Sequence, residues 1–264
     1  MATTTIAAPE TASSLKRRVS YTRAFMGLVR RDFRVLGREI GPFLVRVAMN
    51  PTVGLAATGG GFGTVLLPGL MAVAIMFSGI AAVALPLSQE FGITREIDDR
   101  VMTPLPIEAV AIEKIIFSAM QSIIAACAVF PMAYYIPSPH VQAHVTSWPF
   151  LIAVMVLSSL LAGALGLTIG TAVNPKQIGL IFGVVVMPIT FLGCVYYSWA
   201  ALGPIKWLQY AVMINPIVYM SEGLRAGLTP LAHMPEWLIL TMLIFFLVLL
   251  TWLGLRGFRR RVIS

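Results

Sequence analysis

Long apolar runs separated by short polar or charged stretches define the pattern of this chain. A helix needs about 20 apolar residues to cross the hydrocarbon core of a bilayer, which is about 30 Å thick. The runs predict an all-α membrane protein with six spans, at about residues 41–58, 64–87, 107–135, 148–172, 177–198 and 236–256. The composition agrees, because 58% of the residues are hydrophobic and 11% are charged, whereas soluble domains carry about a quarter charged residues.

The first span, 41–58, is the weakest of the six. It is short and contains several polar or helix-breaking residues: Pro42, Arg46, Asn50 and Pro51. We include it because without it the strongly basic N-terminal segment would lie outside. Arg46 either reaches back to the inner membrane surface or pairs with a carboxylate near the inner end of the third span, Glu108 or Glu113.

The residues before the first span divide into two parts. Residues 1–14 are rich in Thr, Ala and Ser, lack the apolar core of a signal peptide, and are predicted to form a disordered cytoplasmic tail. Over residues 15–40, apolar positions recur every three or four residues among many basic ones: Phe25, Leu28, Val29, Phe33 and Leu36. This spacing predicts an amphipathic helix on the inner membrane surface, with a solvated helix as the alternative.

The distribution of Lys and Arg sets the orientation. The net charge is +8, and with both termini inside, 16 basic residues lie on the inner side and two, Lys206 and Arg225, on the outer side. This bias predicts cytoplasmic termini, including a basic tail over residues 257–264. Since the basic residues flank apolar spans, anionic lipid accounts for them better than nucleic acid does.

Two stretches between the spans are candidates for function. The inner loop over residues 90–106 holds a cluster of charges that predicts a docking element for a soluble partner, with a merely solvated loop as the alternative: Glu90, Arg95, Glu96, Asp98, Asp99 and Arg100. The outer stretch 200–234 is apolar but broken by four residues: Gly203, Pro204, Pro216 and Pro230. It predicts a pair of short helices that dip into the outer leaflet, or otherwise an interfacial aromatic belt. Within it, Glu222 and Arg225 are three residues apart and can pair on one helix face.

Other patterns predict packing rather than chemistry. Small residues recur every four positions along the fourth span and indicate close helix packing, within the subunit or between two subunits: Ser158, Ala162, Gly166 and Gly170. Cys127 and Cys194 lie in apolar runs, as buried free thiols do. His140 and His144 alone provide too few ligands for a metal. We find no catalytic constellation at one membrane depth.

Both candidate stretches resemble those of type-2 ABC exporter permeases, such as the drug-resistance and nodulation-factor export permeases. The inner loop carries one part of the likeness. The outer motif carries the more specific part, through Asn215, Pro216, Tyr219, Glu222, Gly223 and Arg225. The resemblance covers nearly the whole chain, from the basic amphipathic start through a six-span domain over residues 41–256.

The resemblance implies a function and a set of partners. The inner loop would be a coupling helix that contacts an ABC ATPase, through Glu90, Glu96 and Arg100 among others, and residues 203–226 would be re-entrant helices near an outer gate. Two ATPase copies would bind ATP and Mg, since this chain has no phosphate-binding loop of the Gly-x-x-x-x-Gly-Lys-Ser/Thr type. A second permease subunit, identical or not, would complete the export path in the bacterial cytoplasmic (inner) membrane.

The substrate implied is amphipathic: a drug, an antibiotic or a lipid-linked molecule. Export of a polysaccharide or glycolipid by the same machinery is the alternative. A secondary transporter or channel is disfavoured, because the second, fourth and fifth spans lack charged residues along the midplane. The chain itself is expected to be no enzyme.

Overall fold

The computed structural model describes residues 25–34, 37, 60–90, 107–135, 145–174 and 177–263. Within these ranges every regular element is a helix, as the all-α prediction required. The longest are α2 (Gly60–Gln89), α4 (Ile107–Tyr135), α5 (Trp148–Ala172) and α10 (Glu236–Ile263). The shorter ones are α6 (Ile178–Ile181), η3 (Phe182–Val186), α7 (Met187–Phe191), η4 (Trp199–Leu202), α8 (Lys206–Ala211), η5 (Val212–Ile214) and α9 (Pro216–Leu228).

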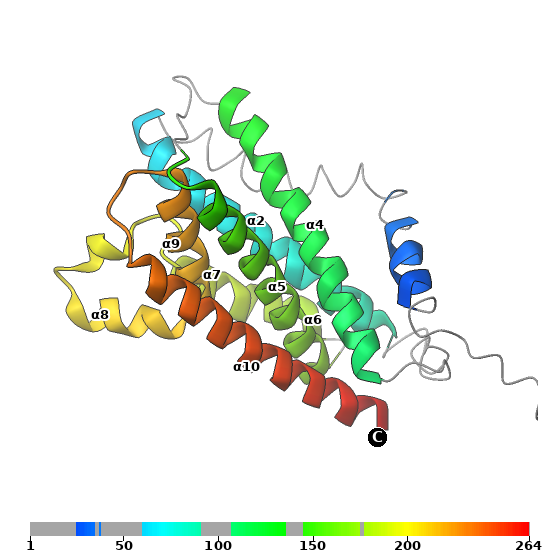
Figure 1. The fold of residues 1–264 in the computed structure, drawn as a ribbon. Coiled ribbons are helices and arrows are strands. Elements are labelled where there is room, and N and C mark those ends of the chain that lie inside the picture. Colours follow the sequence, from blue (N-terminus) through cyan, green and yellow to red (C-terminus); the bar gives the residue numbers. More distant parts are fainter. Residues whose placement is uncertain are drawn as a thin grey trace, which may run out of the picture.

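Among the described residues, four helices are long and apolar enough to cross a membrane: α2, α4, α5 and α10. They coincide with the predicted spans 64–87, 107–135, 148–172 and 236–256, and α4 and α5 have the bounds that the sequence predicted. In Figure 1 α4, α5 and α10 all run from the upper left to the lower right, with α10 the least steep. The predicted first span, 41–58, lies outside the described residues, as do Arg46, His140 and His144.

The ladder of small residues lies within the subunit, where it joins α5 to α2. A Cβ added at Gly79 of α2 would lie 2.5 Å from the Ala162 Cβ, and one at Gly166 would lie 3.0 Å from the Ile80 backbone. Gly170 faces Ala84 and Leu87 of α2 in the same way. Side chains larger than those present would force the two helices apart, so the ladder sets their separation.

The predicted fifth span, 177–198, differs from the structure. A helix begins at Ile178, contains a π-helical segment over Phe182–Val186, and ends at Phe191. Its 14 residues rise about 21 Å at ~1.5 Å per residue, which is less than the ~30 Å core. The helix ends there because Gly193 packs against Ile217 and Cys194 adopts a left-handed φ of 53°, a conformation that no right-handed helix contains.

The basic residues at the C-terminus belong to α10, which continues through them to Ile263. One Nη of Arg261 donates to the carbonyls of Gly170, Thr171 and Val173 at the end of α5, at 2.8–3.2 Å. The Arg256 guanidinium lies 5.4 Å from the centre of the Trp252 ring. The tail therefore caps a neighbouring helix as well as carrying charge.

Two smaller predictions also meet the structure. Of the two cysteines, Cys194 is buried as expected, but Cys127 is exposed on α4, so its burial was predicted wrongly. Apolar runs do not show which face of a spanning helix meets lipid.

Residues 25–34 of the predicted amphipathic helix are helical, and the Phe33 ring meets the Phe117 ring of α4 edge to face, with 5.8 Å between ring centres.

Candidate functional site: two buried ion pairs

Helix α9 is the most deeply buried of the short helices. Asn215 caps its start by accepting a hydrogen bond from the Ile217 N–H at 3.0 Å, and Pro216 takes the first helical position, where its missing N–H has no cost. Every residue from Ile217 to Leu228 is buried. A helix that is buried all round belongs to the core rather than to a surface.

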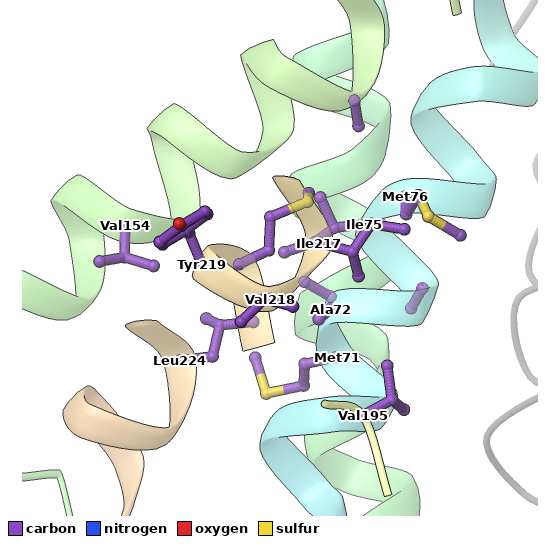
Figure 2. Close-up of a cluster of buried hydrophobic side chains, with 14 of the residues drawn as sticks. Met71, Ala72, Ile75, Met76, Val154, Val195, Ile217, Val218, Tyr219 and Leu224 are labelled. Carbon is purple, nitrogen blue, oxygen red and sulfur yellow. The ribbon is translucent and has the colours of Figure 1, made fainter. Parts of the chain in front are cut away.

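The surroundings of α9 are the spanning helices α2, α5 and α10. Figure 2 shows Ile217, Val218 and Leu224 of α9 facing Met71 and Ile75 of α2. Gly223 allows the closest approach on the other side, since a Cβ there would lie 2.7 Å from Val154 of α5 and 3.0 Å from Ile239 of α10. The Tyr219 ring lies 5.9 Å from that of Phe246, and its hydroxyl donates to the Met213 carbonyl at 2.8 Å.

The first ion pair joins Glu222 to Arg225 within α9, as their spacing predicted. We call it the outer pair, after the side of the membrane that the sequence predicts for it. Both side chains are fully buried. Glu222 Oε1 accepts from Arg225 Nη1 and from the Trp199 N–H at 3.0 Å, and Oε2 accepts from the Met234 N–H at 3.2 Å. Arg225 Nη2 donates to the Cys194 carbonyl at 3.1 Å. Since buried charges are tolerated only when paired and hydrogen-bonded, these backbone partners are part of the site.

Further hydrogen bonds tie neighbouring segments to α9. The Ser221 hydroxyl donates to the Gly193 carbonyl at 2.6 Å, and the Asn215 amide nitrogen donates to the Ile189 carbonyl at 2.6 Å. At the other end, the Thr146 N–H donates to the Gly227 carbonyl at 3.0 Å. We call α9, residues 189–199 and Met234 the α9 hub. Asn215 thus caps two helix ends, the last turn of α7 and the first turn of α9.

The second ion pair, called the inner pair after its predicted side of the membrane, joins two different helices. Lys114 Nζ of α4 lies 2.9 Å from Glu90 Oε1 at the end of α2, and their side chains are 7% and 8% exposed. A second bond between the same helices runs from the Ser118 hydroxyl to the Gly79 carbonyl at 3.0 Å. Glu113, beside Lys114, is also fully buried.

The sequence anticipated these sites unevenly. It singled out the outer motif, and the structure brings Asn215, Tyr219, Glu222, Gly223 and Arg225 together in α9. It missed Ser221, although a serine beside a predicted pair in an apolar stretch was a signal. It assigned Glu90 to an exposed docking surface, whereas the structure buries Glu90 against Lys114. A lysine within an apolar span, as an intramembrane charge, was the available hint.

The rest of the inner loop lies outside the described residues, including Arg95, Glu96, Asp98, Asp99 and Arg100. In the described part of the chain, no group of three or more His, Cys, Asp or Glu side chains is placed to hold a metal ion. Within each site the two charged side chains contact each other, and Glu222 and Arg225 also bind backbone groups. This is the chemistry of helix positioning.

Comparison with known proteins gives one family. The ABC-2 type transporter family matches residues 23–229, a range that includes both ion pairs and the loop between α2 and α4. The inner membrane transport permease YadH of Escherichia coli strain K12 is 29% identical over 187 residues, which cover 69% of each chain. The protein of the same name from Shigella flexneri is similar to the same extent.

Proposed function

Because the chain belongs to the ABC-2 type transporter family, it is a membrane subunit of an ABC transporter, and we propose that it is the permease of an exporter driven by separate ATPase subunits. The observation that carries the proposal is the extent of the family match, which runs from the basic N-terminal segment through helix α9. The similar proteins are named inner membrane transport permeases, in agreement with a multi-pass protein of the bacterial inner membrane.

The loop between α2 and α4 is the proposed docking element for the ATPase. It leaves α2 after Glu90 and enters α4 at Ile107, and its charged residues between these points are the proposed contacts: Arg95, Glu96, Asp98, Asp99 and Arg100. Two ATPase subunits would each meet one such loop and would bind ATP and Mg. Glu90 takes a different role, because its carboxylate is buried against Lys114.

The α9 hub is the proposed re-entrant element at the outer end. Gly227 lies against Leu151 near the start of α5, and Tyr219 lies against Phe246, ten residues into α10. Helix α9 therefore runs along the spanning helices, and the irregular segment over residues 192–198 lies beside it. Irregular backbone at membrane depth requires protein partners for its polar groups, and the bonds to Glu222, Arg225, Ser221 and Asn215 supply them.

The helix over residues 178–191 is the proposed contact with a second permease subunit. Its Leu180, Val184 and Met187 side chains are exposed, and a Cβ added at Gly179 or Gly183 would have no neighbour within 4 Å among the described residues. A small-residue face of this kind allows close helix contact. We expect Gly183→Leu to weaken self-association of the permease in detergent without changing its folding. Unchanged self-association would place the subunit contact elsewhere.

The test of the function is co-purification with a candidate ABC ATPase, chosen from the genes that neighbour this one. Wild type is expected to retain the ATPase, and Glu96→Lys to lose most of it while still inserting into the membrane. Glu236→Lys, at the exposed start of α10, is the matched charge reversal at the opposite end and should retain it. A wild-type permease that retains no ATPase would remove the main support for an ATP-driven exporter.

The substrate class needs its own measurement. We propose an amphipathic substrate, and the fluorescent dye Hoechst 33342 is a suitable probe. Cells that express the permease and its ATPase should accumulate less dye than cells with an ATPase that cannot hydrolyse ATP. Equal accumulation in both would favour the alternative, a surface glycan or glycolipid.

A further inference from the structure

The Glu90–Lys114 pair connects the two ends of the loop between α2 and α4. Glu90 is the residue that directly follows α2, and Lys114 lies in the second turn of α4, so the pair closes a loop of chain whose ends are 24 residues apart. Both side chains are almost fully buried, and the 2.9 Å contact is direct. The chain therefore leaves and re-enters the helix bundle at one fixed point.

Stability alone does not explain a pair in this position. Taking two charges out of water costs several kcal/mol, and well-packed apolar residues in the place of a buried pair are often as stable. An ion pair differs from an apolar contact because it is directional and holds two particular atoms together. The pair therefore fixes the relative position of the ends of α2 and α4 more strictly than apolar packing does.

Helix α2 connects the Glu90–Lys114 pair to the α9 hub. Near its outer end, Gly69 lies so close to the Val195 carbonyl that a Cβ would be 1.9 Å from the oxygen. Further along α2, Thr190 donates to the Met76 sulfur at 3.9 Å. Residues 190–195 are in turn held by Ser221 and Arg225 of α9. A displacement of α2 along its axis would therefore move this turn of the hub.

We propose that the Glu90–Lys114 pair is a positioning element that makes α2 and α4 move as one unit when the loop between them is displaced. The movement reaches the α9 hub through the contacts of Gly69 and Met76. This role rests on the proposed function, since the displacement comes from the ATPase bound to the loop. Glu90 and Lys114 act behind the loop and touch neither the ATPase nor the substrate.

The experiment uses the full permease–ATPase complex in lipid nanodiscs. An environment-sensitive fluorophore is attached at Trp207→Cys, because Trp207 is exposed on α8 beside the hub. Cys127 is replaced by Ser to remove the exposed native thiol. The signal is the change in emission when the complex is trapped with Mg-ATP and vanadate. Retention of the ATPase by each variant is measured in parallel.

Wild type is expected to show a clear emission change. Glu90→Gln and Lys114→Met should retain the ATPase, but their emission change should be at least about fivefold smaller than that of wild type. A fivefold reduction corresponds to a coupling loss of about 1 kcal/mol. The exchanged variant Glu90→Lys/Lys114→Glu should recover the response. Ser118→Ala removes the hydrogen bond from α4 to the Gly79 carbonyl of α2 without touching the pair and should respond like wild type.

Several results would overturn the proposal. Single variants that respond like wild type would show that the pair transmits nothing, and loss of the ATPase from them would show that the pair belongs to the docking surface. If the single variants do not fold, Lys114→Arg, which keeps the pair, must respond like wild type. A folded exchanged variant that shows no emission change also contradicts the proposed role of the pair. A wild-type complex that retains no ATPase would instead refute the proposed function.

Discussion

The two buried ion pairs lie at opposite ends of the helix bundle and connect different things. Glu222 and Arg225 lie within one turn of α9, so their contact with each other joins no two elements; their backbone partners at Trp199, Met234 and Cys194 do. Glu90 and Lys114 join two helices directly. The outer pair binds several segments of the chain at one point, whereas the inner pair links one helix directly to another.

This difference separates two uses of buried charge. The outer pair is fully buried and its partners are backbone groups, which have fixed positions once the fold has formed. The inner pair has side chains of 7% and 8% exposure and one direct contact between two flexible side chains. We infer that the outer pair determines whether the hub folds, and the inner pair determines how it moves.

The largest expected effect is that of Arg225→Met. The substitution leaves the Glu222 carboxylate buried without its counter-charge, which costs about 3–5 kcal/mol of unfolding free energy. Thermal unfolding of the detergent-solubilised protein, followed by size-exclusion chromatography, measures the effect. Lys114→Met should cost less, because its partner lies at a helix end. A melting temperature of Arg225→Met equal to that of wild type would show that the outer pair does not organise the hub.

Removal of both charges of a pair should have different effects on stability at the two sites. Glu90→Met/Lys114→Met should recover most of the stability lost in Lys114→Met, because apolar residues can replace a buried pair. Glu222→Met/Arg225→Met should not recover, because the N–H groups of Trp199 and Met234 lose their acceptors at about 1–3 kcal/mol each. Double-mutant cycles on unfolding free energies provide the comparison. Equal recovery at both ends would mean that the backbone partners contribute little.

Asn215 tests the hub without any change in charge. Asn215→Ala removes the cap of α9 and the bond to the Ile189 carbonyl, at a cost of about 2 kcal/mol for the two together. Asn215→Ser keeps a capping oxygen and loses only the second bond, so its cost should be about half as large. Thermal unfolding distinguishes the two substitutions. If Ala and Ser are equivalent, the cap is formed by other groups.

The smallest expected effect is that of Arg261→Gln at the inner end. Arg261 binds three carbonyls of α5, as the outer pair binds backbone groups, but it is only partly buried. We expect a loss of about 1 kcal/mol, since water can replace some of these bonds. The control is Arg260→Gln on the exposed face of α10, with no expected change. A loss as large as that of Arg225→Met would show that burial is not what makes the outer pair costly to remove.

The sequence predicted those parts of the fold that depend on hydrophobicity and short spacing. The bounds of α4 and α5 follow from apolar runs, and the Glu222–Arg225 pair follows from a spacing of three residues. The end of the helix at Phe191 does not, because an apolar run shows which residues avoid water but not whether the helix continues through Gly193 and Cys194. The Glu90–Lys114 pair depends on how two helices pack, which local sequence does not contain.

The bond between Glu222 and the Met234 N–H also constrains how the protein is made. Met234 is buried just before α10, and α9 packs against α10, so the pocket of Glu222 closes only after the C-terminal helix has been synthesised and inserted. A nascent chain that stops before residue 236 holds a carboxylate and a guanidinium in an unfinished pocket. The last helix is therefore the element that completes the surroundings of the Glu222–Arg225 pair.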